Sequence, residues 1–361
     1  METISKISHR KHLQLVKDYQ ASATLAKLVC VSDAEKGIQR SKNGKNFSYK
    51  LEDKILKDKP VIERIKKLAI PPAWQSVWIC VKENGHIQAT GFDVKKRKQY
   101  RYHPLWSVLR NETKFHKMVE FGNALPALRL QLEKDLALKE LSEKKVLAAV
   151  ISLMERTFIR VGNAAYEKMN GSHGLTTLHD KHVQVEGSKI YFSFKGKKSI
   201  LHDIALKNKK LAGIVKECRD IPGKELFQYY DTDGQRRSID SGMVNTYIKE
   251  ITGQDYSAKD FRTWAGCLHF LQAFKAILLD NGAEVPNKSG VNILLDEVSK
   301  KLGNTRTVCK KYYVHPGIVK LYEENKLQTY LKELDSIEEN DGTAALTNVE
   351  KVLMKLLKKI N

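Results

Sequence analysis

Residues 143–163 read EKKVLAAVISLMERTFIRVGN, and this stretch decides the fold that the sequence predicts. Its apolar residues recur at the spacing of one face of an α-helix. That face consists of Val146, Val150, Leu153, Met154 and Phe158. A helix with such a face needs a hydrophobic core to pack against, so we expect a helical domain to surround it.

The chain before this helix predicts a small sheet. VWICV at 77–81 and HIQATGFDV at 86–94 flank a Glu-Asn-Gly segment, and Asn-Gly is the favoured two-residue turn of a hairpin. Residues 32–67 are rich in Lys, Ser, Gly and Asn, which indicates an exposed basic segment that leads into a short helix. We therefore predict an N-terminal domain over residues 1–107.

The chain after the helix predicts a second hairpin and further helices. HVQVEGSKIYFSFKGKKS at 182–199 alternates around a Glu-Gly-Ser turn and ends in a lysine-rich tip, while 243–281 and 290–332 have helical periodicity. We predict a domain over residues 108–332. Residues 333–361 should form a polar linker and a C-terminal amphipathic helix, VEKVLMKLLKKI.

Composition indicates a folded, basic protein. The 361 residues include 63 Lys plus Arg against 42 Asp plus Glu, a net charge of +21, and 42% are hydrophobic. A positive field of this size attracts polyanions, of which nucleic acids are the commonest and anionic membranes a weaker second choice. In KKRKQYRYHPLW at 95–106 cations alternate with aromatic residues, as suits phosphate contacts or, alternatively, a solvated strand edge.

Several classes of site do not fit the sequence. The five cysteines are widely spaced without a CxxC pair, and no carboxylate cluster suggests two-metal chemistry, so we expect no metal site and no cofactor. GKKS at 196–199 lacks the preceding glycine of a nucleotide-binding loop, because Tyr191 stands there. The segment Asp231–Gly234 suits a hairpin turn better than a calcium loop.

The sequence also lacks the patterns of export and of membrane insertion. METISKISHRKHLQ has no apolar signal-peptide core, and no stretch approaches the roughly 18 apolar residues of a membrane span. We expect a cytoplasmic, nucleoid-associated protein.

A basic protein that cleaves DNA without a metal must take its nucleophile, its cations and its acid from side chains, and Tyr, Arg and Lys can supply them.

Seven stretches together resemble one known family. They are IPPAWQSVWIC, GHIQATGFDVKKRKQYRYHP, EKKVLAAVISLMERTFIRVGN, GLTTLHDKHVQVEG, FKGK, ITGQDYSAKDFRTWAG and LGNTRTVCKKYYVHP, in this order between about residues 30 and 320. In order and spacing they are similar to the type IB DNA topoisomerases, in the compact poxvirus and bacterial form. FKGK alone would carry no weight.

The resemblance implies a catalytic set of Arg160, Lys197, Arg262, Asn304 and Tyr313. Tyr313 would attack the phosphorus to form a 3′-phosphotyrosyl bond, the arginines would stabilise the transition state, Lys197 would protonate the 5′ oxygen, and Asn304 would take the place of a histidine found in some relatives. The bond energy is conserved, so relaxation of supercoils of either sign needs neither ATP nor metal. The adjacent Tyr312 is the alternative nucleophile that a shift of one position would select.

The resemblance also implies an α+β fold shaped as a bilobed clamp. A small, mostly β N-terminal domain and a larger, mostly α catalytic domain of the tyrosine recombinase and type IB topoisomerase kind would close on duplex DNA, as a monomer without a nucleotide cofactor. The N-terminal domain would contact DNA through seven residues, namely Gln99, Tyr100 and Tyr102, which match the family, together with the cations Lys95, Lys96, Arg97 and Lys98.

Two other functions fit parts of the sequence. A tyrosine recombinase would share the nucleophile and the cations, but its second arginine usually lies in an HxxR motif, where this chain has Lys259 before Arg262. A DNA-binding protein of purely architectural function would bind DNA and form no covalent adduct.

Overall fold

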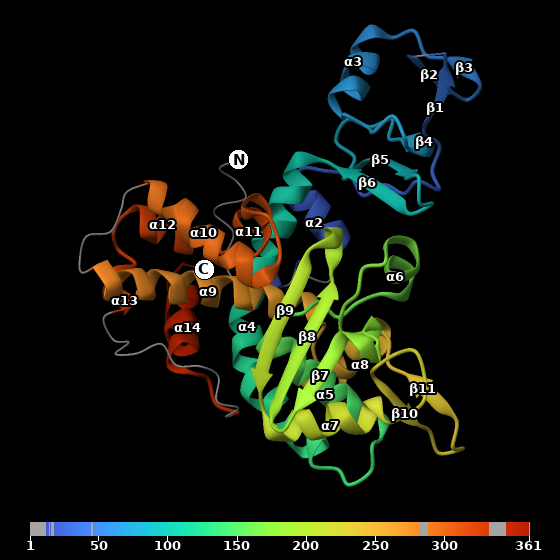
Figure 1. Cartoon of the computed structure of the whole chain (residues 1–361). Coiled ribbons are helices and arrows are strands. Elements are labelled where there is room, and N and C mark those ends of the chain that lie inside the picture. Colours follow the sequence, from blue (N-terminus) through green and yellow to red (C-terminus); the bar gives the residue numbers. More distant parts are fainter. Residues whose placement is uncertain are drawn as a thin grey trace. The chain divides into compact units, whose positions relative to one another are not determined.

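The computed structural model describes residues 12, 13, 15, 18–44, 46–281, 288–331 and 344–360. The protein has a mixed architecture of helices and antiparallel sheets (Figure 1). It divides into two compact units, with the boundary inside helix α4 (Pro104–Leu136): the first unit extends to Lys117 and the second covers Met118–Ile360. No helix of the described ranges is long and apolar enough to cross a membrane.

The first unit contains a six-stranded antiparallel sheet in the order β3-β2-β1-β4-β5-β6. Its elements are α2 (Tyr19–Leu25), β1 (Ile38–Asn43), β2 (Asn46–Leu51), β3 (Lys54–Ile55), α3 (Lys59–Lys67), β4 (Gln75–Ile79), β5 (Ile87–Phe92) and β6 (Lys98–Tyr102). Helix α3 packs on the sheet through Ile65, which lies in one core cluster with Ile38 and Ile79.

The predicted hairpin of the first unit is confirmed as β4 and β5, and the predicted short helix as α3. The predicted two-residue Asn-Gly turn was wrong, because residues 80–86 separate the strands and the Gly85 N–H donates to the Lys82 carbonyl at 3.2 Å. The segment before α3 is mostly exposed, as predicted, but three strands that were not predicted form within residues 38–55. The sequences of β1 and β2, IQRSKN and NFSYKL, give no sign of strands, because most of their side chains are exposed or half-buried and no alternation of apolar residues marks a buried face. Ile38 is the fully buried exception.

The second unit combines a three-stranded sheet with a group of helices. Its first elements after α4 are α5 (Glu143–Thr157), α6 (Ala164–Asn170), β7 (Val183–Glu186), β8 (Lys189–Lys195), β9 (Leu201–Lys207), α7 (Lys209–Arg219), β10 (Gln228–Tyr230) and β11 (Arg236–Ser238). Strands β7 and β8 are the predicted second hairpin, and β9 extends it into an antiparallel sheet beside α5 and α7 (Figure 1). The predicted turn at 231–234 joins β10 to β11.

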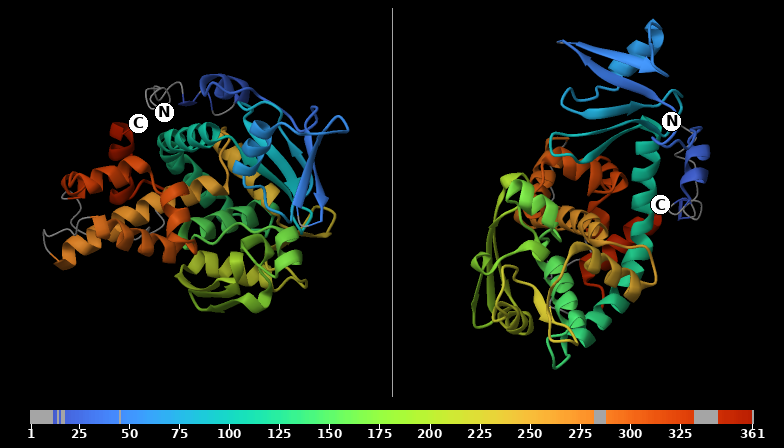
Figure 2. Two further views of the ribbon diagram at one scale, coloured as in Figure 1. Left: turned by 90° about the horizontal axis from the view of Figure 1, so that it is seen from above. Right: turned by 90° about the vertical axis from the view of Figure 1, so that its right-hand side faces the viewer.

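The remaining helices are arranged around α9. They are α8 (Ser241–Thr252), α9 (Ala258–Asn281), α10 (Lys288–Leu302), α11 (Arg306–Tyr312), α12 (Pro316–Glu323), α13 (Gln328–Leu331) and α14 (Asn348–Ile360). Helix α9 contacts α5, α8, α10 and α14 and runs through the helical region in both views of Figure 2. The expected C-terminal amphipathic helix is thus α14, which packs on α9. The expected polar stretch before it lies largely outside the described residues.

Helix α5 is more deeply buried than its one-sided pattern predicts. Eleven of its residues are buried, including Lys145 and Ser152, so neighbouring elements cover it on most sides. The placement of Phe158 within this helix was wrong. The helix ends at Thr157 because Phe158 adopts the left-handed conformation with φ 58° and turns the chain away.

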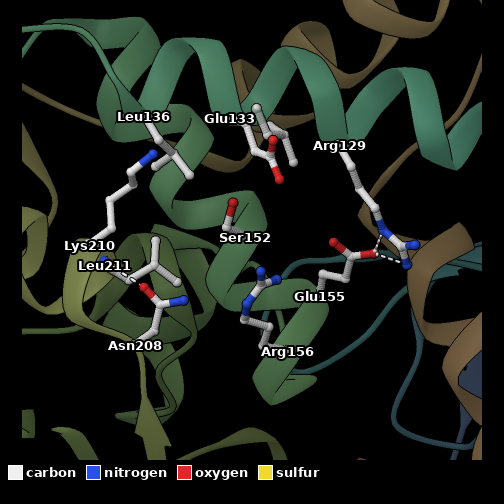
Figure 3. A pocket seen from close by; sticks show the side chains of 10 residues that line it. Arg129, Glu133, Leu136, Ser152, Glu155, Arg156, Asn208, Lys210 and Leu211 are labelled. Carbon is white, nitrogen blue, oxygen red and sulfur yellow. Dashed lines mark hydrogen bonds and ion pairs between the residues drawn. The ribbon is translucent and has the colours of Figure 1, made fainter. Parts of the chain in front are cut away.

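A buried ion-pair cluster joins three segments of the second unit. Arg129 of α4 contacts Glu155 of α5 and Glu350 of α14, each at 2.7 Å (the pair with Glu155 is drawn in Figure 3). Trp264 of α9 donates its indole N–H to the same Glu350 carboxylate at 3.0 Å. The C-terminal helix is therefore held by a charged contact inside the core as well as by its apolar face.

Candidate active site

Three of the five expected catalytic residues meet in the second unit. Arg160 and Arg262 both donate to the amide oxygen of Asn304, Arg262 at 3.1 Å. Arg160 also donates to the carbonyl of Gly303 at 3.0 Å. Because both donors are cations, the Asn304 amide must turn its oxygen toward them and its NH2 group away.

The loop that carries Arg160 is shaped by its backbone. The left-handed Phe158 at the end of α5 starts the loop, and its carbonyl accepts from Arg262 at 2.5 Å. Further along, the Arg160 carbonyl accepts from the Leu175 N–H at 2.8 Å. Gly174 permits this approach, because a Cβ there would lie 2.5 Å from the Arg160 oxygen. Arg160 thus lies just after α5, in a loop whose backbone is held by hydrogen bonds.

Arg262 lies in the first turns of α9 and is 7% exposed. Its guanidinium donates to the Leu302 carbonyl at 2.7 Å in addition to the contacts above. Its Nε is buried and has no hydrogen-bond partner among the described residues. A buried N–H without a partner is uncommon in a folded protein and often marks the place of a ligand.

No carboxylate of the described residues forms an ion pair with Arg160 or Arg262. Burial, and then repulsion by Arg262, lowers the pKa of Arg160 to about 10. Burial also lowers the pKa of Arg262, against the attraction of Tyr313. Both guanidiniums remain charged at neutral pH, so the site holds two positive charges, Arg262 buried and Arg160 half-buried, that no carboxylate of the described residues neutralises.

Tyr313 lies directly after α11 and faces Arg262. The guanidinium carbon of Arg262 is 5.4 Å from the centre of the Tyr313 ring. Gly266 of α9 allows this approach, because a Cβ there would lie 2.5 Å from the Tyr313 carbonyl oxygen. Tyr312 is 43% exposed and its ring contacts Lys311 instead. Of the two adjacent tyrosines, Tyr313 is therefore the one that the fold brings to the arginines.

Lys197 is not brought to the other four residues by any hydrogen bond or ion pair of the described chain. It is exposed, in the turn between β8 and β9, where Lys198 and Ser199 have φ of 63° and 58°. His202, which the sequence analysis missed, links this turn to the arginine site. Its ring lies against Gly196 of the turn and against Gly303 beside Asn304, and a Cβ at either glycine would approach it to 2.6 Å.

Comparisons with known proteins identify the family of the chain. The family model of the eukaryotic DNA topoisomerase I catalytic core matches residues 95–340, and that of the bacterial DNA topoisomerase IB N-terminal domain matches residues 46–93. DNA topoisomerase 1B of Acanthamoeba polyphaga mimivirus is 32% identical over 302 residues, which cover 80% of this chain and 88% of the viral protein. The chain belongs to the type IB DNA topoisomerases.

More distant relatives of this topoisomerase extend the likeness to poxviruses. DNA topoisomerase 1B of vaccinia virus (strain Copenhagen) is 23% identical over 292 residues, covering 78% of this chain and 89% of the relative. DNA topoisomerase I of monkeypox virus matches to the same extent. These matches confirm the family that the seven stretches indicated.

The seven expected DNA-contact residues of this topoisomerase lie on β6 and on the turn before it. Tyr100 and Tyr102 project from one face of β6, are 42% and 45% exposed, and stack with ring centres 5.7 Å apart. Gln99 and Arg97 bond Asp93, and Lys98 pairs with Asp33 at 2.6 Å. Lys96 is exposed and Lys95 half-buried in the turn. Acidic residues of the protein thus already compensate part of this cation run.

The thiols of the topoisomerase's catalytic unit are shielded. Burial raises the pKa of Cys309 to about 11, although Arg262 and Arg160 act in the opposite direction. Cys267 is also buried, and its sulfur accepts from the His315 N–H at 3.3 Å. A thiol with a raised pKa carries little reactive thiolate at neutral pH. Cys309 is therefore expected to be inert toward mild oxidants.

A cavity of about 210 Å³ lies apart from the catalytic set. Its lining comes from α4, α5 and the start of α7 and includes Arg129, Arg156 and Lys210 (Figure 3). None of the five catalytic candidates lines it. A DNA-binding surface can be long and shallow and need not form a cavity. The presence of this cavity is therefore no argument against the site around Arg160 and Arg262.

Proposed function

We propose that this type IB topoisomerase relaxes positive and negative supercoils of duplex DNA by cutting one strand with Tyr313 and resealing it. The observation that carries the proposal is the pair of Arg262, which is buried, and Arg160, which is half-buried, without a carboxylate partner among the described residues. An uncompensated buried charge costs free energy, and a DNA phosphate supplies the missing negative charge. The reaction conserves the phosphodiester energy in a 3′-phosphotyrosyl bond, so it uses neither ATP nor a metal.

The two arginines bind the non-bridging oxygens of the scissile phosphate. A guanidinium presents several N–H donors in a rigid plane, which suits the charge that builds on these oxygens in the transition state. The buried Nε of Arg262 is one donor that a phosphate would satisfy. The ring of Tyr313 lies beside Arg262, so the nucleophile and a cation that binds the phosphate are neighbours.

Asn304 donates from its NH2 group to a phosphate oxygen. Its amide oxygen is held by Arg160 and Arg262, so the amide orientation is set before DNA arrives. A preset donor costs no reorganisation during the reaction. Asn304 is neutral and acts only as a hydrogen-bond donor, which leaves proton transfer to another residue.

Lys197 protonates the 5′ oxygen as it leaves. The exposed turn between β8 and β9 gives its ammonium the freedom to reach a bound strand, and the ammonium is a donor that this role requires. His202 is a positioning residue for the turn, because its ring is wedged between Gly196 and Gly303. The general acid is thereby tied to the loop that holds Asn304.

The two units act as the lobes of a clamp on duplex DNA, with a second unit of the tyrosine recombinase kind. In the first unit, Tyr100, Tyr102 and Gln99 set the position of the duplex, and the cations at 95–98 contact phosphates. The enzyme works as a monomer. While the 5′ end is released, torque in the DNA rotates it about the intact strand.

The deciding experiment is relaxation of negatively and positively supercoiled plasmid in EDTA without ATP. Wild type, Tyr313→Phe and Tyr312→Phe are compared, and covalent adducts are trapped with detergent. We expect wild type and Tyr312→Phe to relax both plasmids and form adducts, and Tyr313→Phe to bind DNA without doing either. Tyr312→Phe is the matched control, since it removes one hydroxyl at the next position.

Two results would contradict the proposal. Loss of adduct in Tyr312→Phe rather than in Tyr313→Phe would move the nucleophile by one residue. Binding of plasmid by wild type without any change in linking number would favour an architectural protein, and strand exchange between two DNA duplexes would favour a recombinase.

A further inference from the structure

Three histidines that the proposed reaction does not use lie together in the second unit. His173, His179 and His182 each offer one ring nitrogen, and these nitrogens lie within 4.8 Å of one another. The ring centres are 4.4–5.1 Å apart. No cysteine pair or carboxylate cluster marks this group in the sequence, and a loop and two short 3₁₀ turns bring it together.

Hydrogen bonds decide which nitrogens of two rings carry a lone pair. His173 Nδ1 lies 2.6 Å from the Thr177 carbonyl oxygen, so Nδ1 carries the proton and Nε2 keeps its lone pair. His179 Nε2 lies 2.9 Å from the Glu167 carboxylate, so Nε2 carries the proton and Nδ1 keeps its lone pair. A histidine that binds a metal usually donates its other ring N–H to such an oxygen, which orients the ring and raises its basicity.

His182 can provide a third nitrogen by exchanging one contact. Its Nδ1 accepts from the backbone N–H of His179 at 3.0 Å. A metal ion at Nδ1 would replace that N–H, whereas a metal ion at Nε2 would displace the ring proton. Because either exchange has a cost, His182 should add less to metal affinity than the other two rings.

Charges around the cluster partly favour a cation. Glu167 bonds His179 and also pairs with Lys224 at 3.0 Å. The Asp180 carboxylate interacts electrostatically with His179, and its Oδ1 is buried without a partner among the described residues. Lys181 opposes a cation near His182. Two carboxylates therefore interact with the cluster, against Arg219, which attracts the Asp180 carboxylate, and two exposed lysines.

We propose that His173, His179 and His182 bind a transition-metal cation of the Zn²⁺ class, with water completing the coordination. Imidazole nitrogen is a preferred ligand of Zn²⁺, Cu²⁺ and Ni²⁺, and three such ligands with an open position form a recognised zinc geometry. The site is separate from the proposed cleavage chemistry, and no step of that chemistry passes through it.

The position of the site indicates that a bound cation would stabilise the surrounding fold. The His173 N–H donates to the Lys195 carbonyl at the end of β8, and the following residues hold the Arg160 carbonyl. A cation that joins His173 to His179 would thus tighten the segment between the Arg160 loop and the strand that leads to Lys197. Binding should raise the thermal midpoint of the whole protein.

The test is titration of the full chain with ZnCl2 after removal of metals, followed by isothermal calorimetry and by the midpoint of thermal unfolding. Variants are His173→Gln/His179→Gln, His182→Gln and Glu167→Gln. His103→Gln is the matched control, since it removes one half-buried histidine from the other unit. Circular dichroism in EDTA shows that each variant is folded.

We expect wild type and His103→Gln to bind one Zn²⁺ and to unfold at a higher temperature with zinc. The double variant should lose both effects. Glu167→Gln, which leaves all three rings in place, should weaken binding about 10- to 100-fold, and His182→Gln should weaken it less than the double variant. Co²⁺ should give a spectrum without a sulfur charge-transfer band.

The proposal fails if wild type binds no zinc. It fails equally if the double variant and Glu167→Gln bind as tightly as wild type, or if Co²⁺ reports thiolate ligation. Should the double variant not fold, Glu167→Gln and His182→Gln still decide, because neither removes the two main ligands. Retention of plasmid relaxation by the zinc-free enzyme would leave the proposed function untouched.

Discussion

Arg129 and Arg262 are both buried in the second unit, at 5% and 7% exposure, yet their surroundings differ. Arg129 faces the carboxylates of Glu155 and Glu350. Arg262 faces carbonyl oxygens, an amide and a second arginine, with no carboxylate of the described residues beside it. Burial acts on both, but the two carboxylates raise the pKa of Arg129 whereas the pKa of Arg262 is lowered.

The difference distinguishes Arg129, whose charge stabilises the fold, from Arg262, whose charge is available to bind a substrate. The fold accounts fully for the charge on Arg129, because it joins α4, α5 and α14. It does not account for Arg160 and Arg262, whose mutual repulsion the protein tolerates. Such a pair is stabilised when a phosphate enters, and this stabilisation is greatest for the transition state, in which the phosphate carries most charge.

The largest effect should come from the uncompensated pair. Arg160→Ala removes a phosphate donor and relieves repulsion with Arg262, so we expect DNA cleavage to slow by about 10²- to 10³-fold with little loss of stability. Single-turnover cleavage and urea unfolding measure the two quantities. Arg156→Ala is the control, since Arg156 lines the cavity between α4, α5 and the start of α7 and is not one of the catalytic candidates. A large loss of stability in Arg160→Ala would show that the pair is structural after all.

The opposite pattern is expected at the compensated arginine. Arg129→Met leaves Glu155 and Glu350 buried without a cation, which should lower the free energy of unfolding by about 3–5 kcal/mol. Cleavage per folded molecule should stay near that of wild type. Urea unfolding and single-turnover cleavage at low temperature test this. Unchanged stability would mean that water already compensates the two carboxylates.

The same cluster should make stability depend on pH. Burial raises the pKa of Glu350, but the bonds and charge of Arg129 outweigh it and hold the pKa below the ordinary value. The stabilisation is present above the unfolded pKa of about 4.3 and is lost as pH falls through the lower folded pKa. Urea midpoints from pH 7 downward should fall more steeply in wild type than in Glu350→Gln. Parallel curves would rule this out.

A smaller effect is expected where the catalytic turn meets the arginine site. His202→Ala removes the ring between Gly196 and Gly303, so Lys197 is less well held and cleavage should slow about 10- to 100-fold. A substrate with sulfur at the 5′ bridging position expels a thiolate that needs no proton. If His202 acts through Lys197, this substrate should restore most of the rate to both His202→Ala and Lys197→Ala. If cleavage by His202→Ala stays slow on this substrate, His202 acts through Arg160 and Arg262 rather than through Lys197.

The smallest effect should appear in the first unit. There too, the effect of removing a lysine should depend on whether a carboxylate already pairs with it. Lys96→Gln should reduce the slope of log affinity against log salt by about 1, because this exposed cation has no carboxylate bond among the described contacts. Lys98→Gln should change the slope less, since Asp33 already pairs with Lys98. Equal slopes for the two variants would show that the pair opens when DNA binds.

Local patterns predicted the elements that have a regular period and the residue types of the site. The hairpin of β4 and β5, helix α14 and the lysine-rich turn follow from spacing of a few residues. Strands β1–β3 were missed, since their exposed polar side chains show no period. The end of α5 was misplaced at Phe158, because its left-handed turn serves a contact with Arg262, which is 104 residues away in the chain.

The motifs, read in their order along the chain, were enough to predict the family, the chemistry of the side chains and the candidates for nucleophile, cations and acid, because such motifs can be recognised without knowledge of the fold. Motif spacing already favoured Tyr313 over Tyr312. Only the packed fold shows that Tyr313 meets Arg262, that Asn304 turns its oxygen to both arginines, and that His202 lies against the turn that carries Lys197. It alone also showed which buried arginines lack a counter-charge. These are contacts between distant segments, and burial and charge compensation arise only when those segments pack.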